Sequence, residues 1–267
     1  MTKLLSVLVP TYNNYELFLR VVEKYLFDLR IIILVSDDSD DYIEKKSIQL
    51  FCKNNNIIYF NGPKKSAVEN WNYLIGKTTT PFFVVNHHDE YPDNLYFLDS
   101  LDPKNTDLVI LPCSSKVGKY PLVKMFSWQQ KYFSKICLLW PNGTLNMILA
   151  PTASIIVNSK YKNILFDIKL KWFVDSYWYY KLFIQSIKER NKIKFFSHSR
   201  INSFQAENSI TNSLKSKLKI QIKKEKDYFR YKGLLPNKNI RFFQLIILIV
   251  ITFRSKFKNK LSRFIFF

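Results

Sequence analysis

The stretch LLSVLVPTYNN, residues 4–14, decides the fold class of this chain. Its first seven residues form an almost unbroken apolar run, which ends at a proline and a cluster of polar residues. A strand buried on both faces has this pattern, whereas a strand with one solvated face alternates apolar and polar residues. The stretch therefore predicts a central strand of a parallel sheet with both faces covered.

Strand-like and helix-like patterns alternate on the C-terminal side of this stretch. A second buried strand is predicted at residues 31–36, and further strands are predicted at residues 57–60, 81–86, 107–113, 154–157 and 193–200. Helical spacing of apolar residues is found at residues 15–29, 42–55, 67–77, 174–190 and 213–232. A polar loop is expected at residues 201–212, and mixed helical and loop structure at residues 120–150. Alternation with short links predicts an α/β fold with a doubly wound, mainly parallel sheet.

Composition limits the class of protein further. A chain of 267 residues with 47% hydrophobic content can form one sizeable core, or one domain with an appendage. The three cysteines are far apart and odd in number, so they fit neither a disulfide framework nor a zinc ribbon. Free cysteines of this kind indicate a reducing compartment.

Positive charge is concentrated at the C-terminal end. Of the net charge of +20, residues 213–267 carry +13. Within them, the apolar run at residues 242–253 is too short to cross a bilayer and is followed by apolar residues at helical spacing among lysines. This pattern predicts an interfacial membrane helix, although packing on the domain or in an oligomer would also explain it. We expect a domain over residues 1–212 and a basic, apolar, membrane-associating helical extension over 213–267.

Three polar clusters follow predicted strands directly. They are TYNN (11–14), SDDSDD (36–41) and NHHDE (86–90). Because ligands bind at the carboxyl ends of parallel strands, we expect the three clusters to form one site. Each cluster taken alone has a simpler interpretation, since Asp40 or Asp41 could cap a helix and NHHDE could be a polar turn.

Two of the chain's three histidines lie in the third cluster. On an extended strand end, His87 and His88 would point to opposite faces, so a shared zinc ion is not expected. A carboxylate such as Asp89 at a strand end instead suits Mg²⁺ or Mn²⁺, which bind oxygen ligands and phosphates.

Taken together, these motifs resemble the family 2 glycosyltransferases of the GT-A fold. The resemblance rests on SVLVPTYNN, ILVSDDSDD, the segment GPKKSAVENWNYLIGKTTTPFFVVNHHDEYPDNL and the segment APTASIIVNSKYKNILFDIKLKWFVDSYWYYKL. They occur in the family's order and cover roughly residues 4–182. One departure is that the metal motif, usually richer in Asp, reads His88-Asp89-Glu90 here.

The resemblance implies a GT-A, Rossmann-like fold and a metal-dependent, inverting transfer of a sugar from a nucleotide-diphosphate sugar, expected to be a UDP-sugar, to a hydroxyl. It implies Asp175 as the catalytic base, although a first-turn acid of a helix is a simpler role for that residue. Mn²⁺ or Mg²⁺ would bind Asp89, with Glu90 as a further ligand. The expected nucleotide-sugar contacts are Pro10, Thr11, Tyr12, Asp37, Asp38, Asn70, His88 and Asp89.

The resemblance also implies a role in surface polysaccharide synthesis, with a glycan or lipid-diphosphate-linked acceptor. The protein would then lie in the cytoplasm, peripheral on the inner face of the cell membrane, with the basic extension on anionic lipid. One alternative is a catalytically impaired protein that only binds sugar nucleotides. Nucleic acid is not an expected partner, because the basic excess lies in an apolar tail without a recognised binding motif. A nucleotidyltransferase is disfavoured because VPTYNNYE contains no glycine.

Overall fold

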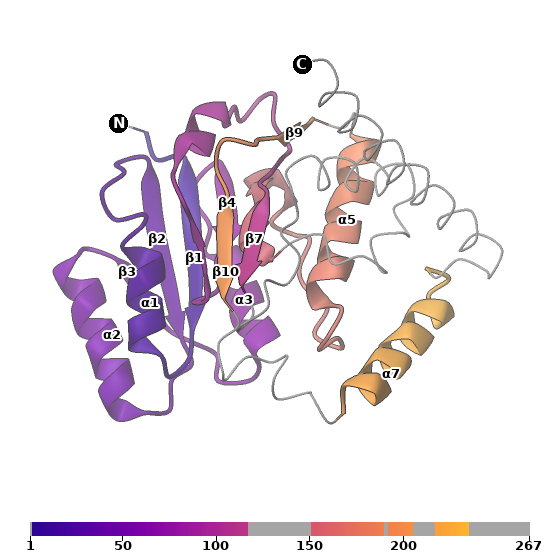
Figure 1. The fold of residues 1–267 in the computed structure, drawn as a ribbon, viewed down its shortest axis with the longest axis horizontal. Helices are drawn as coiled ribbons and strands as arrows, with labels where there is room; N and C mark the ends of the chain where they lie inside the picture. Colours follow the sequence, from indigo (N-terminus) through magenta and orange to yellow (C-terminus); the bar gives the residue numbers. More distant parts are fainter. Residues whose placement is uncertain (1, 117–150, 190–191, 205–216, 235–267) are drawn as a thin grey trace, which may run out of the picture. The chain divides into compact units, whose positions relative to one another are not determined.

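The structure is a computed structural model that describes residues 2–116, 151–189, 192–204 and 217–234. It contains a seven-stranded sheet in the order β3-β2-β1-β4-β8-β6-β9 (Figure 1). The predictions for residues 120–150 and for the apolar segment 242–253 lie outside the described residues.

The predicted central strand, β1 (Leu5–Thr11), lies in the middle of the sheet. It pairs in parallel with β2 (Ile31–Asp37) on one side and β4 (Phe82–Val85) on the other. All residues of β1 and β4 are buried, as the unbroken apolar runs predicted. Burying each large apolar side chain stabilises the fold by roughly 1.5–3 kcal/mol, so this pair of strands forms the centre of the core.

Three helices follow the first three strands. They are α1 (Tyr15–Val22), α2 (Tyr42–Asn54) and α3 (Ala67–Gly76), after β1, β2 and β3 (Ile58–Asn61). Each begins at a polar cap, because the side chains of Asn14, Asp41 and Ser66 accept hydrogen bonds from first-turn N–H groups. α1 and α2 lie side by side at one edge of the sheet (Figure 1). Since the strand order reverses after β3, right-handed crossovers put α3 on the opposite face, which makes the sheet doubly wound.

The first helix is shorter than its apolar pattern predicted. The pattern extended to residue 29, but α1 ends at Val22 and a turn follows. Backbone bonds from Lys24 and Tyr25 to carbonyls three residues earlier tighten the helix end. Phe27, one of the residues that extended the pattern, is 91% exposed.

The second half of the sheet contains its one antiparallel strand. β8 (Ile155–Asn158) runs antiparallel to β4 and to β6 (Leu108–Ile110), and β9 (Ile193–Phe195) pairs in parallel with β6. The single strand predicted over residues 107–113 is divided at Pro112 into β6 and β7 (Cys113–Lys116). A proline cannot donate a ladder hydrogen bond, which favours a break there. Helix α5 (Val174–Lys188) was expected over residues 174–190.

A second, three-stranded sheet was not predicted. It has the order β5-β10-β7, with β5 over Glu90–Pro92 and β10 over Ile201–Phe204. The expectation of a polar loop from residue 201 was wrong for β10. β10 acquires its strand structure from pairing with two segments about 90 and 110 residues earlier, and such non-local pairing leaves little local pattern.

The chain forms two compact units, residues 1–222 and residues 223–267. The boundary lies within helix α7 (Leu218–Tyr231), whereas the predicted boundary after residue 212 falls among residues the structure does not describe. α7 lies within the basic helix expected at residues 213–232. Among the residues described, no helix has the length and apolar character needed to cross a membrane.

An ion pair with one buried partner joins three segments around the second half of the sheet. Asp107 is almost fully buried and its carboxylate accepts hydrogen bonds from Ser186 on α5 and from the backbone of Lys192 before β9. Lys160 Nζ lies 2.8 Å from Asp107 Oδ1. Burial acts to raise the pKa of Asp107, but the hydrogen bonds from Lys160 and Lys192 outweigh it and lower the pKa.

We expect Asp107→Asn to lower the free energy of unfolding at pH 7 by about 2 kcal/mol. Breaking a buried pair costs more, but Lys160 is 42% exposed and solvent screens its charge. Because a lowered carboxyl pKa stabilises the fold above the pKa of the unfolded chain, the difference between wild type and variant should shrink below about pH 4. Urea unfolding at several pH values measures this.

Glu189→Gln is the matched control, because Glu189 pairs with the same lysine at 2.9 Å but is itself 38% exposed. It should cost less than about 1 kcal/mol. Equal costs for the two variants would show that burial of Asp107 does not determine the strength of the pair.

Candidate functional site

The first two polar clusters meet at the carboxyl ends of their strands, as predicted. Thr11 at the end of β1 is in register with Asp37 at the end of β2. The backbone N–H of Asp38 donates to the Thr11 carbonyl, and the Asn13 side chain accepts from the backbone of Asp40 and Asp41. The loops after β1 and β2 therefore form one connected surface.

Tyr12 lies at the outer side of this surface with 52% of its area exposed. Its hydroxyl donates to Asp40 Oδ2 at 3.2 Å, and Lys64 Nζ lies 3.1 Å from Asp40 Oδ1. Asp40 thus links the loop after β1 to the loop after β3. The tyrosine ring keeps an exposed face on which a planar group could stack.

The two predicted aspartates of this surface have different surroundings. Asp37 is fully buried and accepts hydrogen bonds from the Ser39 backbone at 2.8 Å and from the Tyr59 hydroxyl at 3.0 Å. Its carboxylate is therefore engaged inside the protein. Asp38 is only partly buried, and the Lys64 backbone donates to its Oδ1 at 2.8 Å. Burial raises the pKa of Asp38, and the nearby Asp37 adds to this effect.

Space for the Asp38 side chain depends on a glycine. A Cβ atom added at Gly62 would lie 2.1 Å from Asp38 Oδ1 and 2.8 Å from its Cγ. Both distances are far below van der Waals contact. Any other residue at position 62 would displace the Asp38 carboxylate from its present place.

Beneath this surface lie buried polar atoms without partners among the described residues. Asn70 on α3 donates from Nδ2 to the Ser36 carbonyl at 3.2 Å, but its Oδ1 is unpartnered. The hydroxyls of Thr11 and Ser36 are also buried and unpartnered. Pro10, the remaining residue predicted here, is buried in β1 in register with Ser36.

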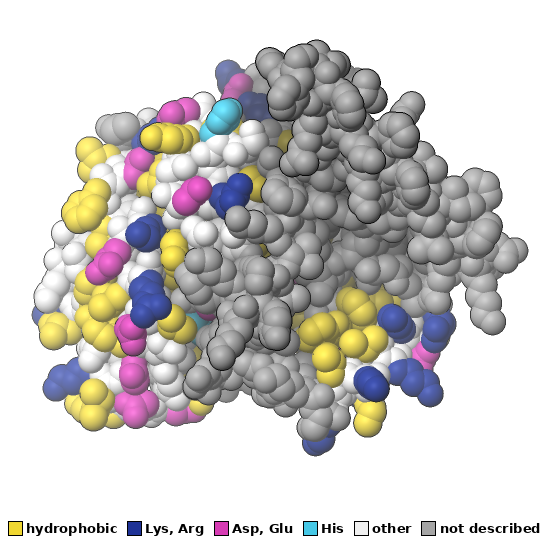
Figure 2. Space-filling view, in the orientation of Figure 1, with side chains coloured by type: hydrophobic (Ala, Val, Ile, Leu, Met, Phe, Trp, Pro, Cys, Tyr) yellow, Lys and Arg dark blue, Asp and Glu magenta, His cyan; other side chains and the backbone are white. Residues whose placement is uncertain are grey.

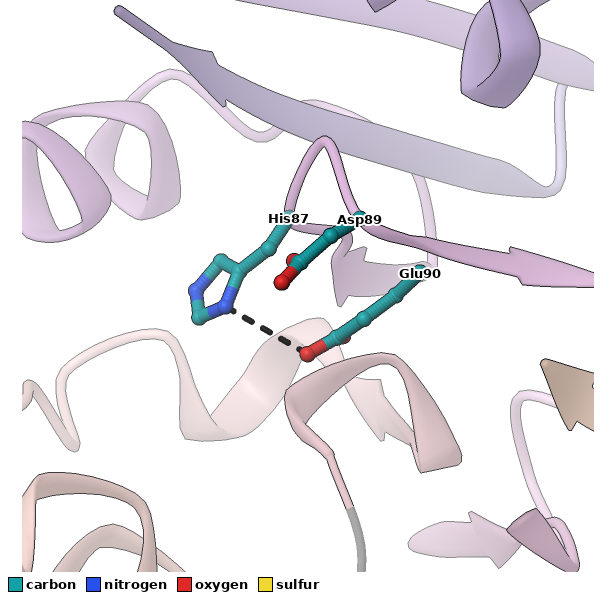
Figure 3. Close-up of side chains that lie close together, drawn as sticks. All are labelled: His87, Asp89 and Glu90. Carbon is teal, nitrogen blue, oxygen red and sulfur yellow. Dashed lines mark ion pairs between the residues drawn. The ribbon is translucent and has the colours of Figure 1, made fainter. Parts of the chain in front are cut away.

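The third cluster is folded differently from its prediction. We expected an extended strand end, but the backbone N–H of Glu90 donates to the His87 carbonyl and closes a turn after β4. The turn brings His87, Asp89 and Glu90 to the same side, with one ligand atom from each within 4.8 Å of the others (Figure 3). His87 Nδ1 lies 3.4 Å from Glu90 Oε1.

His87 is packed on one face against the Trp71 ring of α3, with ring centroids 4.4 Å apart. Burial acts to lower the pKa of His87, but Glu90, Asp175 and Asp89 outweigh it and raise the pKa to about 9. Three carboxylates therefore act on one imidazole. The cluster is built to hold positive charge, whether a proton or a metal ion carries it.

The donor atoms fit a divalent ion. Two carboxylates and an imidazole nitrogen can bind Mn²⁺, and the carboxylates alone would suit Mg²⁺. Bringing Asp89 and Glu90 together without a cation is unfavourable, because burial and the neighbouring Glu90 raise the pKa of Asp89. Asp89, Glu90 and His87 are thus the residues that could hold a metal.

Asp175 lies in the first turn of α5 and completes this group. Its Oδ1 accepts a hydrogen bond from the Thr152 hydroxyl at 3.0 Å. Burial raises the pKa of Asp175, while His87 and the Thr152 hydroxyl act in the opposite direction. A carboxylate with a raised pKa is a stronger base than an ordinary carboxylate and is suited to accept a proton.

The structure thus brings most of the predicted residues into two groups at the carboxyl ends of the strands. One group contains Pro10, Thr11, Tyr12, Asp37, Asp38 and Asn70, and the other contains Asp89, Glu90 and Asp175. His88 is not in the three-residue cluster, whereas its neighbour His87 is, and the sequence analysis had selected His88 rather than His87 as a site residue. The three-residue spacing of His87 and Glu90 was the available signal, because a turn puts such residues on one side.

A family model described as "Glycosyl transferase family 2" matches residues 6–160, which is more than half of the chain. A comparison with proteins of curated function finds no match.

Solved structures resemble the chain at low sequence identity. S. aureus TarS 1–349 in complex with UDP-GlcNAc has a TM-score of 0.57 and 19% identity, over 79% of this chain and 61% of that one. The mannosyltransferase PcManGT from Pyrobaculum calidifontis, in complex with GDP-Man and Mn²⁺, has a TM-score of 0.54 and 11% identity, over 83% and 63%. The longer TarS structure has a TM-score of 0.58 and 17% identity, over 76% of this chain and 37% of that one. These likenesses show the fold, and the chain spans less than two thirds of each of these proteins.

Proposed function

Since the chain belongs to glycosyl transferase family 2, we propose that it transfers a sugar, with inversion, from a nucleoside diphosphate sugar to an acceptor hydroxyl. One observation carries the proposal: the cluster of His87, Asp89 and Glu90, which can hold a cation, lies close enough to the partly buried carboxylate of Asp175 for His87 and Asp175 to shift each other's pKa. A cation next to a carboxylate base is what the transfer requires, because a diphosphate leaves while a hydroxyl loses its proton.

The surface after β1 and β2 would bind the nucleoside. Tyr12 offers an exposed ring face for stacking, and Asp38 offers a carboxylate oxygen to an N–H of the base. Thr11 and Asn70 would support this surface from beneath, where their polar atoms without partners among the described residues are buried. We favour a UDP-sugar, and the UDP-GlcNAc complex of TarS supports this choice by analogy of fold.

A divalent ion, Mn²⁺ or Mg²⁺, held by Asp89 with Glu90 and His87, would neutralise charge on the diphosphate when bound. The Mn²⁺ in the PcManGT complex supports this by analogy of fold. His88 would lie beside the diphosphate, as the motif predicts.

Asp175 would act as the base. As the acceptor oxygen bonds to the anomeric carbon, its proton passes to Asp175, and the bond from that carbon to the diphosphate oxygen breaks. Attack from the face opposite the leaving group inverts the configuration. The packing of α5 holds the base in place, since Trp178 and Tyr179, within a turn of Asp175, are fully buried.

The acceptor would be a glycan or a lipid-diphosphate-linked oligosaccharide of a surface polysaccharide, met at the inner face of the cell membrane. α7 supports this location, since Lys and Arg side chains lie beside hydrophobic ones on it (Figure 2). Ile220 and Tyr231 of α7 are 71% and 92% exposed. A basic helix with exposed apolar residues is suited to an anionic lipid surface.

A panel of UDP-, dTDP- and GDP-sugars with Mn²⁺ or Mg²⁺ tests the transfer, with release of the nucleoside diphosphate as the readout. We expect wild type to release UDP from at least one UDP-sugar.

Asp175→Asn should bind that donor normally but turn it over about 10²–10⁴-fold more slowly, because it lacks the base. Asp89→Asn should instead weaken Mn²⁺ binding, measured by electron paramagnetic resonance. Absence of release from every donor, with lipid-linked glycan acceptors present, would refute the transfer.

We expect Gly62→Ala to weaken UDP binding by roughly 10–100-fold, because its Cβ displaces the Asp38 carboxylate and one charge-assisted hydrogen bond is lost. Isothermal titration calorimetry measures this, and the melting temperature should change little. Gly76→Ala is the matched control, since nothing lies within 4 Å of a Cβ at that position. Unchanged UDP affinity in Gly62→Ala would remove Asp38 from the nucleoside site.

Replacement of Lys223 and Lys224 on α7 by Gln should weaken binding to vesicles containing anionic lipid by roughly 30-fold. Each Lys near such a surface contributes about 1 kcal/mol. Both lysines are exposed, as are Lys46 and Lys53 on α2, whose replacement by Gln is the control with equal loss of charge. Co-sedimentation measures the binding, and equal weakening by the two double variants would show that α7 is not the binding surface.

A further inference from the structure

The short turn before β8 places a hydroxyl on the proposed base, and we propose that Thr152 is a positioning residue for the transfer. Its hydroxyl donates to Asp175 Oδ1 at 3.0 Å and fixes the orientation of the carboxylate. The second oxygen, Oδ2, is then the one that takes the proton of the acceptor hydroxyl. This inference rests on the proposed function, because it takes Asp175 to be the base.

The backbone around Thr152 is fixed on both sides. Thr152 begins the turn η3 (Thr152–Ser154), and all three of its residues are buried. The Ala153 N–H donates to Glu90 Oε2 at 2.9 Å. The Ser154 N–H donates to the Pro151 carbonyl at 2.9 Å, and the Ser154 carbonyl accepts from the Leu111 N–H at 2.8 Å. The Thr152 hydroxyl is therefore held in place before any ligand arrives.

Glu90, which accepts a hydrogen bond from this turn, also belongs to the cluster of His87, Asp89 and Glu90. Glu90 uses Oε2 for the Ala153 N–H, and its Oε1 lies 3.4 Å from His87 Nδ1. The buried Glu90 carboxylate thus contacts both His87, in the cluster that would face the diphosphate, and the turn that orients the base. The distance between the leaving group and the base is set through Glu90 and Thr152 rather than by α5 alone.

A threonine suits this task for two reasons. Its β-branched side chain has few accessible χ1 rotamers, so its hydroxyl direction is well defined. Its hydroxyl can donate to a carboxylate without adding charge, so it orients Asp175 without introducing another ionisable group. Such orientation matters because a misplacement of about 1 Å in a reacting group can cost 10²-fold in rate.

Thr152→Val tests the proposal, since it replaces the hydroxyl by a methyl group of similar size. The probe reaction is hydrolysis of UDP-GlcNAc, UDP-Glc, UDP-Gal and GDP-Man with Mn²⁺, in which water takes the place of the acceptor. We expect kcat to fall about 10–100-fold while KM for the donor and the Kd of UDP stay unchanged. Thr152→Ser, which restores the hydroxyl, should recover most of the rate. In a crystal structure of Thr152→Val, the Asp175 side chain should adopt a different rotamer.

Ser154→Ala is the matched control, because it removes a hydroxyl from the same turn that has no partner among the described residues. It should leave kcat and the Asp175 rotamer as in wild type. If Asp175→Asn abolishes hydrolysis but Thr152→Val behaves like Ser154→Ala, the positioning role is wrong and the base remains. If wild type releases nucleoside diphosphate from none of the donors even with lipid-linked glycan acceptors present, or Asp175→Asn turns the donors over normally, the proposed function itself fails and the role of Thr152 fails with it.

Discussion

The buried carboxylate of Glu90 is the constraint on which the geometry of the candidate site depends. A carboxylate removed from water must be compensated by hydrogen bonds or by positive charge. Glu90 accepts a hydrogen bond from the Ala153 N–H, and His87 provides the positive charge beside it. Because these two partners are more than sixty residues apart, satisfying one side chain joins the turn after β4 to the turn before β8.

This requirement has consequences on both sides of the site. On one side it draws His87 against Glu90 and beside Asp89, so that three groups able to hold a cation come together. On the other side it fixes the turn from which Thr152 reaches Asp175. The carboxylates of Glu90, Asp175 and Asp89 raise the pKa of His87, whereas burial raises the pKa of Asp175 and His87 acts to lower it. We regard this concentration of charge as the physical basis of the proposed chemistry.

The sequence predicted the N-terminal half well because its signals are local. The unbroken apolar runs of β1 and β4, and the helix cap at Asp41, can each be recognised from a few consecutive residues. The second sheet was missed because β10 owes its strand structure to pairing with β5 and β7. Likewise, α1 was overextended because apolar Phe27 continued the helical pattern although it is not buried.

The order of residues was enough to predict a doubly wound α/β protein with polar clusters at the carboxyl ends of its strands, with Asp38 and Asp89 among the candidates, and the family resemblance added Asp175. Local patterns of apolar residues predict both the buried strands and the alternation of strands with helices, so no contact between distant residues is needed to infer them. Only the tertiary structure decided that His87 rather than His88 joins the cluster, that Asp37 faces inward, and that Thr152 contacts Asp175. Those outcomes depend on a backbone turn and on contacts between segments distant in sequence. At such contacts the orientation of a side chain is set by its hydrogen-bond and packing partners rather than by its neighbours in sequence.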